Sequence, residues 1–326
     1  MNPLRAPHAA ISTVALLAAA TLLYLTPAAA QPAWKPDRPV TLVVPYSPGG
    51  GVDTMVRHLG RELQQKWGQN VLVENLPGAD GLIGTRKVVD AKADGHTLLV
   101  QIPALTLSRH LPGFKGTDPV AQLTPISVYA VQAGVLATHT SVPGNTLGEL
   151  VQHCKAAAPP CSFGTTENTA KLQLQMLAQD MPSMVVVNYK GGGQLITDLV
   201  GGSLNAGLFG FTAALPYHKS GRIKILATVG KKRSPVLPSV QTVEEAGFPQ
   251  LQSETWYGLF APRATPAAVV DALAAAVREA AREPAFVNSI AVLGATPVGN
   301  TSAEFAALVR ESAERYADLV RRFPLQ

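Results

Sequence analysis

The sequence has little of what would point to a particular catalytic chemistry. It contains two cysteines and seven histidines in 326 residues, and these residues are not spaced to form a zinc site. No G-x-G-x-x-G, G-K-[ST], G-x-S-x-G or H-E-x-x-H motif occurs. Dinucleotide binding, P-loop chemistry, a serine-hydrolase elbow and zinc proteolysis therefore lack their usual signatures. We expect no cofactor, no metal and no enzymatic activity.

Charge is also scarce. Asp, Glu, Lys and Arg make up 15% of the chain, and the net charge is +5. The one dense basic cluster, Lys231–Arg233, has no interleaved aromatic residues and is followed by Ser234-Pro235. This pattern is typical of a solvated turn, so nucleic-acid binding is not predicted.

A long apolar run occurs only at the start of the chain. It follows Arg5, covers residues 9–25, and leads to the small residues of Pro27–Ala30, a pattern typical of signal-peptidase cleavage. Polar residues interrupt the run, which is shorter than the roughly 20 apolar residues that a membrane span needs. We therefore expect an exported protein with a signal peptide at residues 1–30, cleaved near Ala30. An uncleaved membrane anchor is the alternative.

The two cysteines, Cys154 and Cys161, are seven positions apart. In the oxidising compartment that follows export, such a pair can form a disulfide. A pair of buried free thiols is the alternative, because spacing alone does not fix the geometry that a disulfide requires.

The order of apolar patterns indicates an α/β fold. A strand at Val40–Val44, a glycine loop, a helix ended by Gly68 and a strand at Asn70–Glu74 follow one another, as in a parallel sheet covered by helices. The same order restarts near Gly134. Three alanine-rich helical segments after residue 261 have no further strands to cover, so we expect them to return to the first lobe.

We therefore predict two open-sheet α/β lobes joined by a two-segment hinge. The chain after the signal peptide exceeds the size that is usual for a single core. Lobe 1 is predicted at residues 31–131 and 253–326, and lobe 2 at residues 132–252. The crossing segments are predicted near Val128–Gly134 and Gln250–Thr255.

Three loops rich in glycine or hydroxyl residues each follow a predicted strand and precede a predicted helix. They are Ser47–Asp53, Gly164–Thr169 and Tyr189–Gln194. Free N–H groups at helix N-termini bind anions, and glycine allows a ligand close to the backbone. Several such hydrogen bonds, at roughly 1.5–3 kcal/mol each, hold a carboxylate without arginine. In the structural alternative the loops only turn the chain, and Asp53, Thr166 or Asn168 caps a helix.

Several longer motifs accompany these loops. They are Trp34–Val40, Val44–Asp53, Val73–Ala79, Asn188–Gly191, Lys232–Pro235, Thr242–Gly247 and Trp256–Pro262. Together they cover nearly the whole mature chain and resemble the Bug family of periplasmic receptors, the solute-binding component of tripartite tricarboxylate transporters.

The resemblance implies a hinged periplasmic receptor that holds one carboxylate with its first lobe and the far end of the ligand with its second. The ligand contacts that it implies are Tyr46, Pro48, Gly49, Gly50 and Asp53 in the first lobe and Thr165, Thr166, Thr169, Gly192, Gly193 and Gln194 in the second. Two positions depart from the family pattern. Glu167 would repel an anion if it turned inward, and Gly210 stands where the family often has an aspartate.

The predicted function is capture of a small organic anion, a carboxylate, for delivery to the membrane permease subunits of a tripartite tricarboxylate transporter. We expect the receptor to be a monomer. A receptor that senses a carboxylate for a signalling protein is the alternative. An exported enzyme acting on a carboxylate is a further one, for which the sequence shows no set of acid, base and nucleophile.

Overall fold

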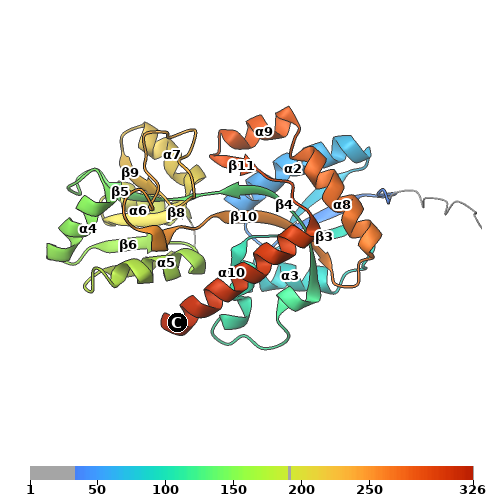
Figure 1. The fold of residues 1–326 in the computed structure, drawn as a ribbon, viewed down its shortest axis with the longest axis horizontal. Coiled ribbons are helices and arrows are strands. Elements are labelled where there is room, and N and C mark those ends of the chain that lie inside the picture. Colours follow the sequence, from blue (N-terminus) through green and yellow to red (C-terminus); the bar gives the residue numbers. More distant parts are fainter. Residues whose placement is uncertain (1–33, 190–191, 326) are drawn as a thin grey trace, which may run out of the picture. The chain divides into compact units, whose positions relative to one another are not determined.

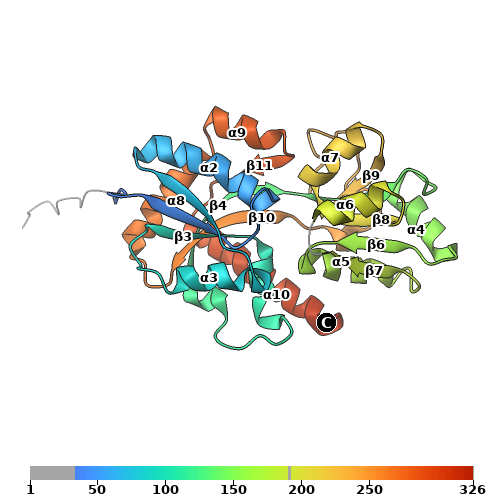
Figure 2. The ribbon, with the colours of Figure 1, turned by 180° about the vertical axis from the view of Figure 1, so that it is seen from behind.

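Two β-sheets carry the fold, and each is covered by helices on both faces (Figures 1 and 2). The computed structural model describes residues 34–189 and 192–325, so the predicted signal peptide and its cleavage point lie outside the described residues. Residues Lys35–Gln326 form one compact unit. Within the described ranges, no helix combines the length and apolarity that a membrane crossing requires.

The first sheet is mixed, with strand order β11-β4-β10-β3-β1-β2. Its strands are β1 (Val40–Val44), β2 (Val71–Asn75), β3 (Thr97–Gln101), β4 (Leu123–Gln132), β10 (Thr255–Pro262) and β11 (Ala295–Pro297). Strand β1 pairs in parallel with β2 and β3, whereas β10 is antiparallel to β3 and β4. The parallel order predicted for the strands that begin the lobe is confirmed, and β10 joins them as an antiparallel strand because it returns from the second lobe beside the outgoing β4.

The helices of this lobe come from both ends of the described chain. They are α2 (Gly51–Trp67), α3 (Leu82–Val89), α8 (Ala267–Ala280), α9 (Pro284–Ala291) and α10 (Ser302–Arg322), with 3-10 turns η1 (Ala79–Gly81), η2 (Pro103–His110) and η3 (Pro119–Gln122). Helix α2 buries an apolar stripe of Met55, Leu59 and Leu63 and ends, as predicted, where Gly68 adopts a left-handed conformation. Helices α8 and α10 contact β4, so the C-terminal helices do return to the first sheet.

The second sheet has strand order β7-β6-β8-β5-β9. Its strands are β5 (Gly134–His139), β6 (Ser162–Thr165), β7 (Val185–Asn188), β8 (Ala206–Gly210) and β9 (Ile223–Thr228), and its helices are α4 (Leu147–Ala156), α5 (Asn168–Ala178), α6 (Gly192–Val200) and α7 (Phe211–Lys219). Leu150 of α4 and Leu177 of α5 belong to one apolar cluster. Leu199 of α6 and Leu215 of α7 belong to another, so each face of the sheet has its own core.

A disulfide joins Cys154 and Cys161, whose Cα atoms are 5.5 Å apart. It connects the end of α4 to the start of β6, and both residues are buried in the cluster between these elements and α5. The bond therefore closes a short loop at the edge of the second lobe.

The chain crosses between the sheets twice. Strand β4 ends at Gln132 and β5 begins at Gly134, so only Ala133 separates the two sheets on the outward path. On the return path the Ser253 N–H donates to Val229 O at 2.7 Å, and Thr255 then pairs with Gln132 in the first sheet. Both crossings fall inside the predicted hinge segments. The exact lobe limits at residues 131–132 and 252–253 stay a prediction.

A small apolar cluster also connects the lobes. It consists of Leu107 of η2, Leu172 of α5, and Tyr316 and Leu319 of α10, each at most 4% exposed. We call it the latch cluster, because α5 belongs to the second lobe while η2 and α10 belong to the first.

We predict that Gly258→Ala lowers the free energy of unfolding by about 1–3 kcal/mol, the usual cost of overpacking a core. A Cβ atom at Gly258 in β10 would overlap the ring of Phe305 in α10, which is fully buried. Urea denaturation measures the change. The control is Gly148→Ala in α4, where a Cβ atom meets nothing within 4 Å. It should stabilise the protein by about 0.5–1 kcal/mol, and equal effects of the two substitutions would contradict the packing argument.

Candidate functional site

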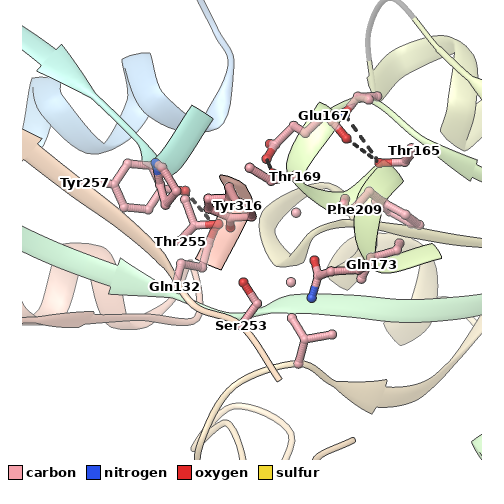
Figure 3. A pocket seen from close by; sticks show the side chains of 17 residues that line it. Gln132, Thr165, Glu167, Thr169, Gln173, Phe209, Ser253, Thr255, Tyr257 and Tyr316 are labelled. Carbon is pink, nitrogen blue, oxygen red and sulfur yellow. Dashed lines mark hydrogen bonds between the residues drawn. The ribbon is translucent and has the colours of Figure 1, made fainter. Parts of the chain in front are cut away.

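A pocket lies where the two crossing segments meet the second sheet (Figure 3). It encloses about 50 Å³. The second lobe contributes Thr165, Thr166, Glu167, Thr169, Gln173 and Gly210 to its wall. The crossing segments and the first lobe contribute Gln132, Gly134, Ser253, Thr255, Tyr257 and Tyr316. The pocket therefore contains residues from both lobes, as a hinged receptor requires.

The turn between β6 and α5 forms the second-lobe wall. Thr165, the last residue of β6, is fully buried and accepts a hydrogen bond from the Glu167 N–H at 3.3 Å. Glu167 is the N-cap of α5 but makes no side-chain capping bond, so the first N–H groups of the helix face the cavity region without that partner. The alternative in which Thr166 or Asn168 caps the helix was wrong. The predicted contacts Thr165, Thr166 and Thr169 all line the pocket.

Gln132 fixes the wall at the crossing. Its Oε1 accepts from the Tyr257 hydroxyl at 3.0 Å, and its Nε2 donates to Thr212 Oγ1 at 3.0 Å and to Leu293 O at 2.6 Å. The side chain is 5% exposed, so these bonds replace the water that it would otherwise bind. Gln132 thus joins the first sheet to α7 and to the loop before β11.

Gln173 has a similar structural role on the other side of the pocket. This α5 residue donates from Nε2 to Leu251 O at 2.6 Å, and the side chain is buried. The bond attaches α5 to the segment that leads into the return crossing. The two pocket glutamines therefore hold walls in place with groups that are already hydrogen-bonded.

The charge in the pocket comes from Glu167. Among the lining residues that the structure describes, it is the only one that carries a formal charge when ionised near neutral pH. Burial raises the pKa of Glu167, and a hydrogen bond from Thr169 Oγ1 at 3.4 Å opposes this effect. A second carboxylate about 4 Å away would be repelled by roughly 4 kcal/mol at an effective dielectric constant of about 20. The acid that the sequence marked as unfavourable for an anion does face inward.

Tyrosines surround this acid. Burial raises the pKa of Tyr46 and of Tyr257, and the negative charge of Glu167 raises both further. Burial also raises the pKa of Tyr316, and again the charge of Glu167 contributes. All three phenols therefore stay neutral at physiological pH, and Tyr46 lies within electrostatic reach of the pocket although it is not a lining residue.

The structure does not place the predicted first-lobe contacts in the pocket wall. Pro48, Gly49 and Gly50 are exposed, and the Tyr46 hydroxyl donates to Gln101 Oε1 at 2.8 Å. The loop nevertheless reaches the pocket where α2 begins, because a Cβ atom at Gly51 would lie 3.7 Å from the Tyr257 hydroxyl. The ligand-binding role of these residues stays a prediction.

Asp53 holds the first loop together. As the third residue of α2, it accepts hydrogen bonds from the Gly49 N–H at 2.9 Å, Arg57 Nε at 3.0 Å and Asn75 Nδ2 at 2.9 Å. Burial would raise its pKa, but the bonds from Arg57, Gly49 and Asn75 outweigh burial and lower it. Gly49 needs its flexibility, since its φ is +78°. The N-cap is Gly50, so the alternative in which Asp53 caps the helix was wrong.

The described residues of the third predicted loop are not part of the pocket wall. Gly192 is half-buried and Gly193 and Gln194 are exposed, while Lys190 and Gly191 lie outside the described residues. Binding by Gly192, Gly193 and Gln194 stays a prediction. Over residues 34–189 and 192–325, no group of three or more His, Cys, Asp or Glu side chains could hold a metal ion.

Sequence reasoning missed the pocket residues Gln132, Ser253, Thr255, Tyr257 and Tyr316. A signal was present for three of them, because Gln132, Ser253 and Thr255 lie in the predicted crossing segments. Ligands of two-lobed proteins bind between the lobes, so polar residues at the crossings were candidates. Tyr316 had no local signal, since it lies within a helix that only the tertiary fold brings to the pocket.

Comparison with known proteins places the chain among transport receptors. Residues 55–325 match the family described as tripartite tricarboxylate transporter family receptor. Protein BugT of Bordetella pertussis is 31% identical over 88% of this chain and 89% of its own. The prediction of a Bug-type binding protein, rather than an enzyme, is thereby confirmed.

Solved structures of similar proteins agree with the two-lobed fold. The periplasmic binding protein BugD is 28% identical, with a TM-score of 0.76 over 88% of this chain and 98% of its own. Rpa4515 of R. palustris, solved with adipate, is 26% identical, with a TM-score of 0.80 over 88% and 97%. MatC of Rhodopseudomonas palustris, solved with bound malate, is 29% identical, with a TM-score of 0.76 over 87% and 99%.

We predict that Asp53→Asn lowers the free energy of unfolding at pH 7 by about 1–3 kcal/mol, because it weakens a buried set of hydrogen bonds to a charged group. The pKa of Asp53 is lowered in the folded state, so its contribution is present above the unfolded pKa of about 3.9. The contribution is lost as the pH falls through the folded pKa. The difference between wild type and variant should therefore shrink in acid, as measured by urea denaturation.

The matched control is Asp90→Asn, which removes the same charge from another aspartate–arginine pair four residues apart. Asp90 and Arg86 are 57% and 66% exposed, so their pair should contribute at most about 0.5 kcal/mol. A loss at Asp90 as large as the loss at Asp53 would show that the loop contacts are not the cause.

We predict the opposite pH dependence for Glu167→Gln. The pKa of Glu167 is raised in the folded state, so the folded protein binds this proton more tightly and loses stability as the pH rises from the unfolded pKa to the folded one. The variant lacks this loss and should be more stable than wild type at pH 7. Urea denaturation between pH 4 and pH 8 tests this, and parallel curves for the two proteins would refute it.

Proposed function

This chain belongs to the receptor family of the tripartite tricarboxylate transporters, and we propose that it captures a small organic carboxylate in the periplasm for delivery to the membrane permease of such a transporter. The observation that carries the proposal is the polar pocket at the double crossing, which takes residues from both lobes. Rpa4515 with adipate and MatC with malate support a carboxylate as the ligand.

Ligand entry in this proposal requires the lobes to part. The pocket encloses about 50 Å³, whereas sites for small molecules usually measure about 300–1,000 Å³. A cavity of this size holds a few water molecules rather than a dicarboxylate. The open form admits the ligand, and hydrogen bonds from both lobes then favour a closed form around it, which the permease recognises.

The donors for a carboxylate come from the two sides of the pocket. On one side are the hydroxyl group of Thr166 and the first N–H groups of α5. On the other are the hydroxyl groups of Ser253 and Thr255 on the return crossing. Because each hydrogen bond to a charged group contributes roughly 1.5–3 kcal/mol, a few of them suffice without a lysine or arginine.

We predict that the true ligand raises the Tm of the purified protein by several degrees. A ligand at 100 times its Kd adds about 2.7 kcal/mol to the stability of a folded protein, provided that it does not bind the unfolded chain. Thermal unfolding with malate, adipate and a panel of other small carboxylates measures the shift. Mass spectrometry of molecules released on denaturing fresh protein identifies any ligand that was carried through purification.

A pair of threonine variants connects the shift to the pocket. Thr166→Val removes a lining hydroxyl and should weaken binding by up to about tenfold. Thr140→Val alters an exposed residue of the turn after β5, outside the pocket wall, and should leave the affinity unchanged. The proposal fails if no carboxylate shifts the Tm, or if the two variants weaken binding equally.

A further inference from the structure

The pocket wall presents an acid to the ligand, and none of its described residues is a cation. Among the described lining residues there is no lysine, arginine or histidine, and Glu167 carries the formal charge (Figure 3). A receptor for carboxylates gains nothing from an inward carboxyl group unless the ligand has a complementary part. The inward position of Glu167 therefore indicates which chemical group the ligand presents to it.

Glu167 keeps most of its hydrogen-bonding capacity for the cavity. An ionised carboxyl group accepts about four hydrogen bonds. Within the described part of the chain, Thr169 Oγ1 donates to it at 3.4 Å. The nearby phenols point their hydroxyl groups elsewhere, since Tyr257 donates to Gln132 Oε1 and Tyr46 to Gln101 Oε1. The remaining acceptor positions are left for a ligand that donates.

We propose that Glu167 is a specificity-determining residue that selects carboxylates whose far end donates N–H hydrogen bonds, as an amide or an ammonium group does. This inference rests on the proposed function and narrows the ligand class. The carboxylate end then contacts the hydroxyl groups of Ser253 and Thr255, which lie across the pocket from Glu167 (Figure 3).

A dicarboxylate fits this wall poorly. Its second carboxylate would face an ionised Glu167, and neither carboxylate could donate a hydrogen bond to the oxygen atoms of the other. An N–H donor satisfies the same oxygen atoms and removes the repulsion. The raised pKa of Glu167, caused by its burial, agrees with a carboxyl group that lacks such a donor while the ligand is absent.

The test uses matched sets of three small molecules with the same chain length. Each set, from three to six carbons, contains the α,ω-dicarboxylate, its monoamide and the corresponding ω-amino acid. We expect wild type at pH 7.5 to bind the best monoamide or ω-amino acid at least about tenfold more tightly than the matched diacid, as measured by calorimetry. The amide and ammonium arms show which N–H donor is preferred.

The isosteric variant Glu167→Gln is expected to lower that preference by about tenfold or more, because it removes the charge and replaces one acceptor by a donor. Binding of the ω-amino acid should suffer most, since the variant removes the charge that attracts an ammonium group. The control Glu311→Gln removes the same charge from an exposed position of α10 outside the pocket wall and should leave the preference unchanged.

Two outcomes overturn the inference. One is a wild type that binds diacids as tightly as their matched amides and amino acids, or binds none of these N–H donors. The other is a preference that Glu167→Gln leaves intact. Either result is compatible with the proposed function if another carboxylate still raises the Tm. A carboxylate panel that leaves the Tm unchanged would instead refute the proposed function.

Discussion

The two sheets are separated by one residue, Ala133, on the outward path, and this constraint sets the place of the pocket. Because Thr255 of the returning strand pairs with Gln132 in register, both crossings are fixed beside each other. The side chains at this point cannot all pack against apolar neighbours, since the cores of the two lobes lie on the faces of the sheets. Polar groups therefore collect there, and the Gln132 side chain joins them to Tyr257, α7 and the loop before β11.

Two carboxyl groups near helix N-termini show how neighbouring groups determine the pKa of an acid. Asp53 lies within α2 and receives hydrogen bonds from Gly49, Arg57 and Asn75, which lower its pKa despite its burial. Glu167 precedes α5 and receives one from Thr169, so desolvation dominates and its pKa is raised. The first acid stabilises a loop, whereas the second is available to a ligand. The two acids thus differ in pKa because different hydrogen-bond donors reach them.

Much of the fold was predictable because local patterns and caps carry it. The strand predicted at Val40–Val44 is β1, and the helix predicted to end at Gly68 is α2, because an apolar run and a terminal glycine mark them. The short strand β11 was missed, since its three residues become a strand only by pairing with β4. In the site, loop chemistry pointed to Thr165, Thr166 and Thr169. It did not point to Gln173 and Tyr316, which helices deliver from elsewhere in the chain.

The latch cluster has a consequence for how quickly solute is exchanged. Leu172 of the second lobe is fully buried against Leu107 and Leu319 of the first. These apolar surfaces are therefore shielded from water by contacts between the lobes, independently of ligand binding. Parting the lobes exposes them again, at roughly 25 cal/mol for each Å² of apolar area. The rates of ligand binding and release then depend on how often the lobes part without a ligand. The rate of ligand exchange then depends on three leucines that lie outside the pocket wall and on Tyr316, which belongs to it.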